Sequence, residues 1–514
     1  MLKVKKMQII GKLLKKTTEI TYNRNFNKGK EYINQLNSLE KLIIKAKNTN
    51  FGLQYNFHDM LNQEELVECY QRNVPINDYD EFYVSWLEDS IKGVKDHTWP
   101  GRIKYYALSS GTTGSPSKRI PITEEMIRSF QKTSMRQIST LHELDLPEKF
   151  FSASILTVGG SVKLTKKENH IEGDLSGILK KHTSFVVNPF TKPGYKIAAI
   201  KDWNKKLEKM VEKAPEWNIG TVAGVPSWCL MLMERIIERY NLTSIHDMWP
   251  NFQVYVHGGV FMQPYIKRLE KLTAKKVHLL DTYLASEGYF AYQHSPEKEG
   301  MQLLLNAGIF YEFVPFNSEF FDETGKAKDL YKAFNLSQVT EGVDYAMIIS
   351  TNAGLWRYMI GDLVRFINVE ERELKITGRI KQFLSLCGEH LSLDNINTAL
   401  QEVCEKEKIE IQEFCLFANA LEECHYWFIG ASAELDSMNI MKKIDTELQR
   451  LNDDYAGVRK YSLNEPILKI VPIELFYDFM DHIGKAGSQN KVPRVMNTEQ
   501  SQRWLSFIAT RGLN

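Results

Sequence analysis

Between residues 150 and 315, short apolar runs that end in small residues alternate with segments of helical periodicity. The expected strands are FFSASILTVGG, WNIGTVAGV, FQVYVHGGV and KKVHLLDTY, and the expected helices include LEKMVEK, SWCLMLMERIIERY and QPYIKRLEKL. Strands that alternate with helices predict a largely parallel sheet with helices on both faces. We therefore expect an α/β fold that binds ligands at the carboxyl ends of its strands.

The charge and cysteine content exclude several classes of function. With 65 Lys and Arg against 64 Asp and Glu, the net charge of +1 offers no basic field for nucleic acid or an anionic membrane. No stretch approaches the roughly 20 apolar residues of a membrane span. The six cysteines are scattered without a CxxC pair, as in a reduced protein. We expect a cytoplasmic monomer that contacts neither nucleic acid nor membrane, with its Lys-rich start, MLKVKKMQIIGKLLKKTTEI, folded as a packed amphipathic helix.

A polar, glycine-containing stretch between Tyr105 and Thr123 suits an oligophosphate. Its consecutive small residues are Ser109, Ser110, Gly111, Thr112, Thr113, Gly114 and Ser115. Glycines let backbone N–H groups approach an anion, hydroxyls donate hydrogen bonds, and the nearby Lys118 and Arg119 offset charge. The stretch follows an expected strand at residues 103–108 and precedes a helix that starts at Thr123, which is a common place for phosphate. It lacks the spacing of a Walker A loop, and a solvated Ser/Thr/Gly loop is the alternative interpretation.

Two further stretches carry candidate nucleotide ligands. In DTYLASEGYF (281–290), Ser286 and Glu287 follow an expected strand, and a carboxylate near a phosphate loop suggests Mg²⁺; the alternative is a surface carboxylate. In AGIFYEFVPF, the aromatic residues from Phe310 onward lie on an expected strand, where they form either a purine-stacking face or a plain core face. In RYMIGDLVRF, the carboxylate of Asp362 offers two acceptors to ribose hydroxyls, unless the Gly-Asp pair is only a β-turn.

The composition becomes helix-rich after ITGRIKQF, where Arg379 and Lys381 lie in a turn. We place a domain boundary there and predict a large N-terminal domain over residues 1–378 and a smaller α+β cap over residues 379–514. The cap is expected to contain helices at 395–406 and 438–451 and a strand at 426–431. Its polar loop HIGKAGSQNKVPR brings together Lys485, Lys491 and Arg494.

Three separated stretches resemble the signature motifs of acyl-adenylate-forming enzymes. They are SSGTTGSPSK at 109–118, YLASEG at 283–288 and YMIGDLVRF at 358–366. The form of the first motif is similar to the Gretchen Hagen family of acyl-acid amido synthetases, in its bacterial-type members. AGVPSW at 223–228, the HGGVFMQPY run at 257–265, FYEFVPF at 310–316 and GKAGSQNKVPR at 484–494 also match, so the resemblance spans essentially the whole chain. GRIKQFLSLCGEHLS departs from the plant members and is closer to the hinge of general adenylating enzymes.

The resemblance implies a role for each matched residue. Lys491 would be the catalytic lysine on a mobile cap, Glu287 the Mg²⁺ partner, and Asp362 the ribose ligand. Phe310 takes the place of an adenine-stacking aromatic residue. The other residues expected to contact ATP are Ser109, Ser110, Gly111, Thr112, Thr113, Thr282, Tyr283, Ser286 and Arg379.

The activity implied is an ATP-dependent ligation. A small carboxylic acid would be adenylated with Mg-ATP, and its acyl group would pass to an amine, in particular that of an amino acid. An acyl-CoA ligase, which shares the first half-reaction, is the alternative enzyme, and a nucleotide-binding regulator without catalysis is the alternative class. The presence of Lys491, Asp362 and Glu287 argues against the regulator. The base that deprotonates the amine is not evident, although His257 is a candidate.

Overall fold

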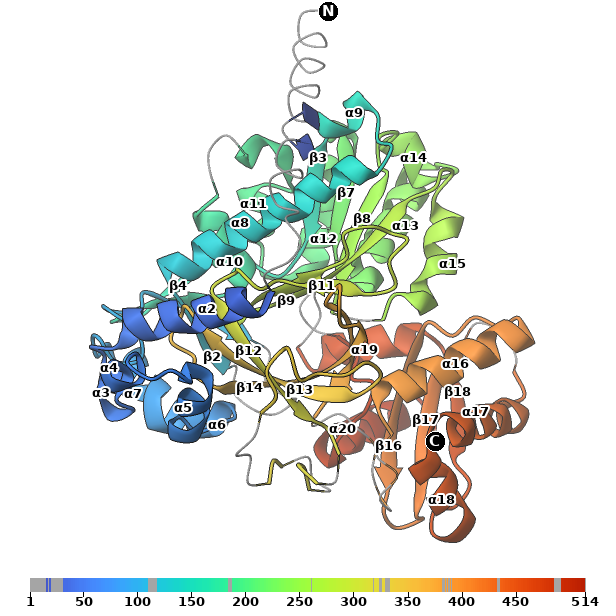
Figure 1. Ribbon diagram of the computed structural model, residues 1–514. Coiled ribbons are helices and arrows are strands. Elements are labelled where there is room, and N and C mark those ends of the chain that lie inside the picture. The colour runs from blue at the N-terminus through green and yellow to red at the C-terminus, as the bar shows by residue number, and fades with distance from the viewer. Residues whose placement is uncertain are drawn as a thin grey trace, which may run out of the picture.

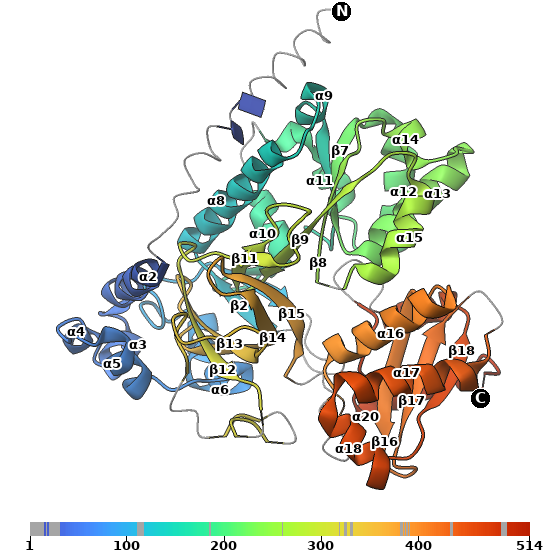
Figure 2. The same cartoon turned by 45° about the vertical axis from the view of Figure 1, so that its right-hand side comes forward.

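The computed structural model describes residues 15–16, 18–19, 31–109, 118–183, 187–259, 261–317, 319–322, 326–328, 333–380, 384, 386, 389, 391–431, 435–484 and 491–513. Most of the Lys-rich start and most of the phosphate-type loop therefore lie outside the described residues. The described part forms a large α/β body and a smaller cap, which Figures 1 and 2 show beside each other. No helix in the described ranges combines the length and apolar character needed to cross a bilayer.

An 11-stranded sheet runs through the large body in the order β12-β13-β14-β15-β11-β10-β9-β8-β7-β3-β6. Its parallel half consists of β3 (Ser154–Val158), β6 (Thr191–Lys192), β7 (Ile219–Gly224), β8 (Val254–Gly258) and β9 (His278–Ala285). Four of these strands match the four runs expected from the sequence. The α/β alternation is confirmed.

Helices cover both faces of the parallel half, as predicted. One face packs against α12 (Trp203–Lys213), α13 (Pro226–Tyr240), α14 (Ile245–Met248) and α15 (Gln263–Leu272), and the other against α8 (Glu124–Thr140) and α9 (Glu148–Phe151). Figure 2 shows α8 and α13 on opposite sides of β7. Helix α13 begins with a proline at its first position and ends where Asn241 adopts a left-handed conformation, and both features are common at helix ends. Its buried face carries Trp228, Cys229, Leu232 and Ile236.

The antiparallel half of the sheet packs against the N-terminal helices. Its strands are β10 (Gly288–Tyr292), β11 (Met301–Leu303), β12 (Ile309–Pro315), β13 (Asp344–Thr351), β14 (Tyr358–Asn368) and β15 (Glu373–Arg379). The helices are α2 (Glu31–Ala46), α3 (Asn50–Gln54), α4 (Phe57–Met60), α5 (Leu66–Asn73), α6 (Tyr79–Phe82), η1 (Tyr83–Leu87) and α7 (Glu88–Ile91). Trp356 is fully buried between them and stacks on Phe51 with ring centroids 5.5 Å apart.

A second, four-stranded sheet frames the phosphate-type loop. It has the order β2 (Lys118–Ile122), β1 (Tyr105–Ser109), β5 (Ile171–Gly173) and β4 (Thr165–Lys166). Ser109 pairs with Lys118 at the end of the antiparallel β1–β2 pair, so the two ends of the segment 110–117 are held next to each other. Helix α8 follows with Thr123 as its N-cap, where the sequence predicted the helix to start.

The cap is a three-layer unit. Its sheet is β16 (Glu413–Asn419), β17 (Cys424–Gly430) and β18 (Ile467–Val471). One face packs against α16 (Leu393–Glu407), α17 (Ser437–Leu451) and α18 (Asp453–Tyr461), and the other against α19 (Glu474–His482) and α20 (Thr498–Ala509). The remaining short elements are α10 (Leu175–Lys181), α11 (Tyr195–Ala198), η2 (Leu141–Glu143), η3 (Asn188–Phe190) and η4 (Ala214–Glu216).

Candidate functional site

The carboxylate of Asp362 has a hydrogen-bond donor on each oxygen. Tyr283 Oη donates to Oδ2 at 2.7 Å, and Arg379 Nε lies 2.8 Å from Oδ1. Asp362 is buried in β14 directly opposite Arg379 in β15, so the alternative interpretation of Gly361-Asp362 as a β-turn is wrong. Gly361 has a φ of +91°, a backbone conformation that favours glycine. Burial, together with the nearby Asp362 charge, raises the pKa of Tyr283 well above its usual range, so Tyr283 stays a donor.

Glu287 is a buried carboxyl in the turn between β9 and β10, together with Ser286. Burial raises the pKa of Glu287, the charge of Lys118 lowers it, and the charge of Asp362 raises it further. Lys118 and Asp362 therefore both lie near Glu287, and Lys118 is at the end of the phosphate-type loop. The Lys118 ammonium also lies over the ring of Tyr79, 4.9 Å from its centroid.

Lys491 reaches this cluster from the cap. Its ammonium donates a hydrogen bond to the backbone carbonyl of Gly259, just beyond β8, although the residue as a whole is exposed. Burial of the ammonium lowers the pKa of Lys491 to about 8; the charge of Arg379 lowers it too, and that of Asp362 opposes both. The sequence-predicted residues Tyr283, Glu287, Asp362, Arg379 and Lys491 therefore share one electrostatic environment.

The ends of β8 and β9 pack closely beneath Lys491. Thr282 Oγ1 donates to the carbonyl of His257 at 2.9 Å, and the Thr282 N–H donates to Asp281 Oδ1 at 2.8 Å. A Cβ on Gly258 would lie 2.5 Å from the Thr282 carbonyl oxygen, so only glycine allows this approach. His257 Nδ1 lies 3.4 Å from Asp281 Oδ1.

Not all predicted residues join the cluster. Ser110, Gly111, Thr112 and Thr113 lie outside the described residues, and Ser109 lies at the loop's entrance opposite Lys118. Phe310 is 2% exposed in the core of the large body, where its ring meets Tyr70 edge-on with centroids 6.2 Å apart. The expectation that Phe310 presents a purine-stacking face is wrong, because the N-terminal helices cover that face of β12.

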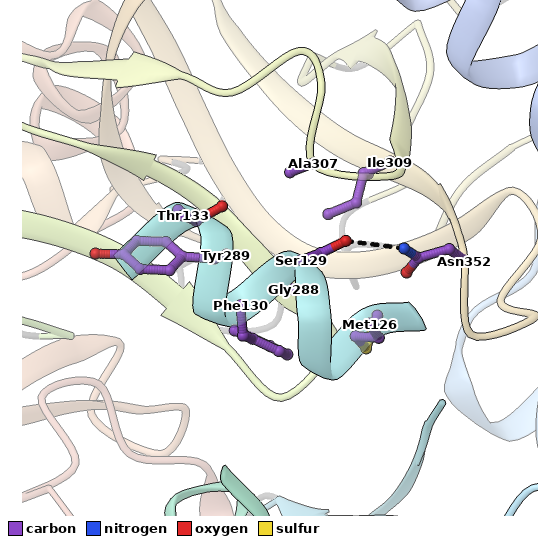
Figure 3. Close-up of a pocket in the computed structure, with 9 residues that line it drawn as sticks. All are labelled: Met126, Ser129, Phe130, Thr133, Gly288, Tyr289, Ala307, Ile309 and Asn352. Atoms are coloured by element: carbon purple, nitrogen blue, oxygen red, sulfur yellow. Dashed lines mark hydrogen bonds between the residues drawn. The ribbon is translucent and has the colours of Figure 1, made fainter. Parts of the chain in front are cut away.

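A small cavity lies next to the Glu287 turn, between α8 and β10 (Figure 3). Gly288 and Tyr289 line it from β10, and Ser129 and Asn352 close one side through a 3.0 Å hydrogen bond from Asn352 Nδ2 to Ser129 Oγ. Its other lining residues are Met126, Phe130, Thr133, Ala307 and Ile309. The cavity is largely apolar and belongs to the packing behind the site.

Tyr265, at the end of the matched run 257–265, and Glu413, which no sequence motif includes, join the cap to the large body. Tyr265 in α15 donates a 2.8 Å hydrogen bond to Glu413 Oε1 at the start of β16. Both side chains are buried, and the only signal in the sequence for Glu413 is its charge at the start of an apolar run, QEFCLFA.

The cluster is suited to a polyphosphate nucleotide. The cations of Lys118, Arg379 and Lys491 surround two carboxylates, and the ends of the phosphate-type loop open beside them. An ionised carboxylate has about four acceptor positions, so Asp362 can accept further hydrogen bonds from hydroxyl groups besides its two existing donors. Within the described residues, no group of three or more His, Cys, Asp or Glu side chains is placed to hold a metal ion.

Comparisons with solved structures identify the fold. The chain matches the GH3.15 acyl acid amido synthetase with a TM-score of 0.74 and 17% identity over 93% of each chain. It matches a 2-hydroxyisobutyryl-CoA ligase in complex with an acyl-adenylate with a TM-score of 0.61 and 12% identity, over 93% of this chain and 91% of the ligase. The chain therefore has the fold of adenylate-forming enzymes, a large α/β body with a separate C-terminal domain.

Sequence comparisons give the family. A jasmonoyl–L-amino acid synthetase of Oryza sativa subsp. japonica is 27% identical over 281 residues, which are 50% of this chain and 48% of the relative. An indole-3-acetic acid-amido synthetase of Oryza sativa subsp. indica is 33% identical over 276 residues, 49% and 44% of the two chains. The chain spans about half the length of these relatives. Residues 26–159 and 146–278 match the GH3 family N-terminal domain, 302–379 its central domain and 394–500 its C-terminal domain. The chain belongs to the GH3 family.

Proposed function

We propose that this protein is an ATP-dependent acyl-acid amido synthetase. It adenylates a small carboxylic acid with release of pyrophosphate, and then transfers the acyl group to an amine, in particular that of an amino acid, with release of AMP. The observation that carries the proposal is the approach of the cap residue Lys491 to Asp362 and Arg379, which face each other across β14 and β15. The activities in the names of the relatives support the same reaction class.

The nucleotide is assigned to the cluster around Asp362. The hydroxyls and backbone N–H groups of residues 109–113 contact the phosphates, and Asp362 accepts hydrogen bonds from the ribose hydroxyls. Thr282, Tyr283 and Ser286 line the nucleotide on the side of β9, and Arg379 adds positive charge. The large body, residues 1–378, binds both substrates, and the mobile cap, residues 379–514, supplies Lys491.

Mg²⁺ is assigned to Glu287. Proteins usually hold this ion with one or two carboxylates and the phosphates of the substrate, so the single carboxylate of Glu287 fits it without a cage of protein ligands. The raised pKa of Glu287 fits a carboxylate that binds a metal ion only when the substrate is present. When bound, the ion neutralises charge on the pyrophosphate leaving group.

The first step joins two anions, so its barrier is largely electrostatic. A carboxylate oxygen of the acid forms a bond to the α-phosphorus while the bond from that phosphorus to the bridging oxygen of pyrophosphate breaks. The Lys491 ammonium stabilises the negative charge that builds on the acyl and phosphoryl oxygens. In the second step a neutral amine attacks the acyl carbon, the acyl–oxygen bond to AMP breaks, and the amine proton passes to a base or to water.

We propose that the protein is a cytoplasmic monomer, because the reaction needs only small molecules as substrates. The described cysteines are all free, which suits a reducing compartment.

The test measures AMP and pyrophosphate release from Mg-ATP over a panel of aryl and alkyl acids. Each acid is run alone, with pooled amino acids and with CoA. We expect release that amino acids stimulate, with the amide identified by mass spectrometry. Release that only CoA stimulates would replace the proposal with an acyl-CoA ligase. ATP binding without turnover on any acid would favour a nucleotide-binding regulator.

A further inference from the structure

The segment that carries Lys491 is tied to the cap sheet by Arg494, three residues further along. Arg494 Nη1 lies 2.7 Å from Glu413 Oε2 and donates to the carbonyl of Phe414 at 3.0 Å. The guanidinium also lies over the Phe414 ring, 4.6 Å from its centroid. The side chain of Glu413 is 1% exposed and that of Arg494 is 14% exposed, so this ion pair is largely removed from water and its remaining hydrogen-bonding atoms need partners.

Backbone hydrogen bonds hold the same segment alongside β16. The Leu416 N–H donates to the Arg494 carbonyl, and the Met496 N–H donates to the Leu416 carbonyl, both at 2.8 Å. Leu416 and Val495 form a parallel bridge. Since only two residues separate Arg494 from Lys491, the position of the Lys491 ammonium depends on where β16 and Arg494 lie relative to the large body.

Tyr265 of the large body completes the ion pair. Its hydroxyl donates to Glu413 Oε1 at 2.8 Å and accepts from Arg494 Nη2 at 3.0 Å, while Tyr477 of the cap donates to the same Glu413 oxygen at 3.0 Å. Tyr265 is 2% exposed. One hydroxyl from the large body therefore bonds both members of a buried ion pair in the cap.

Two of the contacts between the domains lie close together along the same pair of segments. Lys491 contacts Gly259, and Arg494 contacts Tyr265, six residues beyond Gly259. A cap that shifted away from α15 would break both contacts and leave the hydrogen-bonding atoms of Glu413 and Arg494 without the Tyr265 hydroxyl. Hydrogen bonds to charged groups are stronger than those between neutral groups, so the hydroxyl favours the docked position.

We propose that Tyr265 is a positioning residue for Lys491 and acts through Glu413 and Arg494. Docking of the Tyr265 hydroxyl on this ion pair sets the position of the cap in which the Lys491 ammonium enters the site. The inference rests on the proposed role of Lys491 in adenylation. The Tyr265 hydroxyl should therefore affect the formation of the acyl-adenylate but not the transfer of its acyl group to the amine.

The test is Tyr265→Phe, which keeps the buried ring and removes only the hydroxyl. Rapid-quench assays measure acyl-adenylate formation in a single turnover and, separately, amide formation from preformed acyl-adenylate. We expect the first rate to fall about ten-fold, as for the loss of a hydrogen bond to a charged group, with the ATP KM and the second rate unchanged. The matched control is Lys271→Ala, which removes an exposed Lys271–Glu410 pair of 2.9 Å from the same helix and interface and should change either rate less than about two-fold.

Amide hydrogen exchange without substrates provides an independent readout. In Tyr265→Phe we expect faster exchange at Leu416 and Met496 and in α15 than in the wild type or in Lys271→Ala. Arg494→Lys keeps the charge but cannot contact Glu413 and Tyr265 through two separate nitrogens. It should therefore show the same changes as Tyr265→Phe in the kinetic assays and in hydrogen exchange. Equal loss of both half-reactions, or unchanged exchange and unchanged adenylation, would overturn the inference. A wild-type protein that forms no acyl-adenylate would overturn the proposed function instead, and exchange would still decide whether Tyr265 docks the cap.

Discussion

The hydroxyl of Tyr283 donates a 2.7 Å hydrogen bond to Asp362, although β15, β11 and β10 lie between their strands in the sheet. Four strand spacings of roughly 4.8 Å would separate the two strands by about 19 Å in a flat sheet. The sheet must therefore curl so that Tyr283 in β9 and Asp362 in β14 converge. This curl brings the second and third sequence motifs into one site, next to the lysine of the cap.

Replacement of Lys491 by alanine should abolish adenylation without abolishing ATP binding. The ammonium acts on charge that develops in the transition state, so we expect the rate of pyrophosphate release to fall about 10²- to 10³-fold while the ATP Kd changes less than about three-fold. Calorimetry gives the Kd and a coupled pyrophosphate assay gives the rate. Lys442→Ala, on the exposed side of α17, is the control and should keep both values. Wild-type turnover in Lys491→Ala would show that another residue supplies the charge.

The adenylation rate should depend on the charge of Lys491. Because the pKa of Lys491 is lowered from 10.5 to about 8, its ammonium is protonated below pH 8 and loses its proton as the pH rises through that value. We expect a rate that is level below pH 8 and falls about ten-fold per pH unit above it. Arginine keeps its charge over this pH range, so the adenylation rate of Lys491→Arg should not decline above pH 8. That rate should be lower than the wild-type rate at pH values below 8. A decline that persists in the arginine variant would assign it to another group.

Asp362→Asn should weaken ATP binding. The amide cannot hold the charge of Arg379 or accept as strongly from ribose hydroxyls, so we expect the ATP Kd to rise about ten-fold or more. Tyr283→Phe removes one donor to the carboxylate but leaves the carboxylate in place, and should give a smaller rise. Calorimetric titration with ATP distinguishes the two variants, with their melting temperatures as a check on folding. An ATP affinity equal to that of the wild type in Asp362→Asn would exclude the ribose role.

Gly259→Ala should impair adenylation because the new methyl group would occupy the position of the lysine. A Cβ at this position would lie 2.5 Å from Lys491 Nζ. The matched control is Gly101→Ala, since Gly101 has the same φ of +79° but no atom within 4 Å of its Cβ position. Both variants should lose about 1 kcal/mol of stability through backbone strain. Only Gly259→Ala should slow pyrophosphate release, by at least about ten-fold; an equal effect in both variants would attribute the loss to strain alone.

Arg357→Met should strongly destabilise the large body. Arg357 pairs with Glu312 at 2.9 Å, both side chains are 1% exposed, and Arg357 also donates to the carbonyls of Gln71 and Val74. Its loss leaves a buried carboxylate unpaired, which costs about 3–5 kcal/mol. Urea unfolding followed by tryptophan fluorescence should show a lower midpoint. Arg503→Ala, which breaks an exposed pair with Glu499 on α20, should leave the midpoint nearly unchanged, and a similar midpoint for Arg357→Met would contradict the prediction.

The covered parallel half of the sheet was predictable from local pattern. Apolar runs at 219–224 and 254–258 became β7 and β8, and the helical periodicity after Pro226 became α13, because side-chain periodicity depends on residues that are neighbours in the chain. The motifs at 283–288 and 358–366 and the terminal loop at 484–494 also led to Tyr283, Glu287, Asp362 and Lys491 before the structure brought them together. Phe310 shows the limit of such patterns, since an alternating strand looks the same whether helices or a ligand cover its aromatic face.

The sequence by itself determined the α/β class, the strand ends and the set of chemical groups, because these depend on short-range periodicity and on side-chain type. Only the tertiary structure decided which groups meet. The Tyr283–Asp362 contact requires the curl of an 11-stranded sheet, and the Tyr265–Glu413 contact requires one domain to dock on another across 148 residues of chain. Long-range packing makes such contacts, and no local pattern specifies the packing of two distant surfaces.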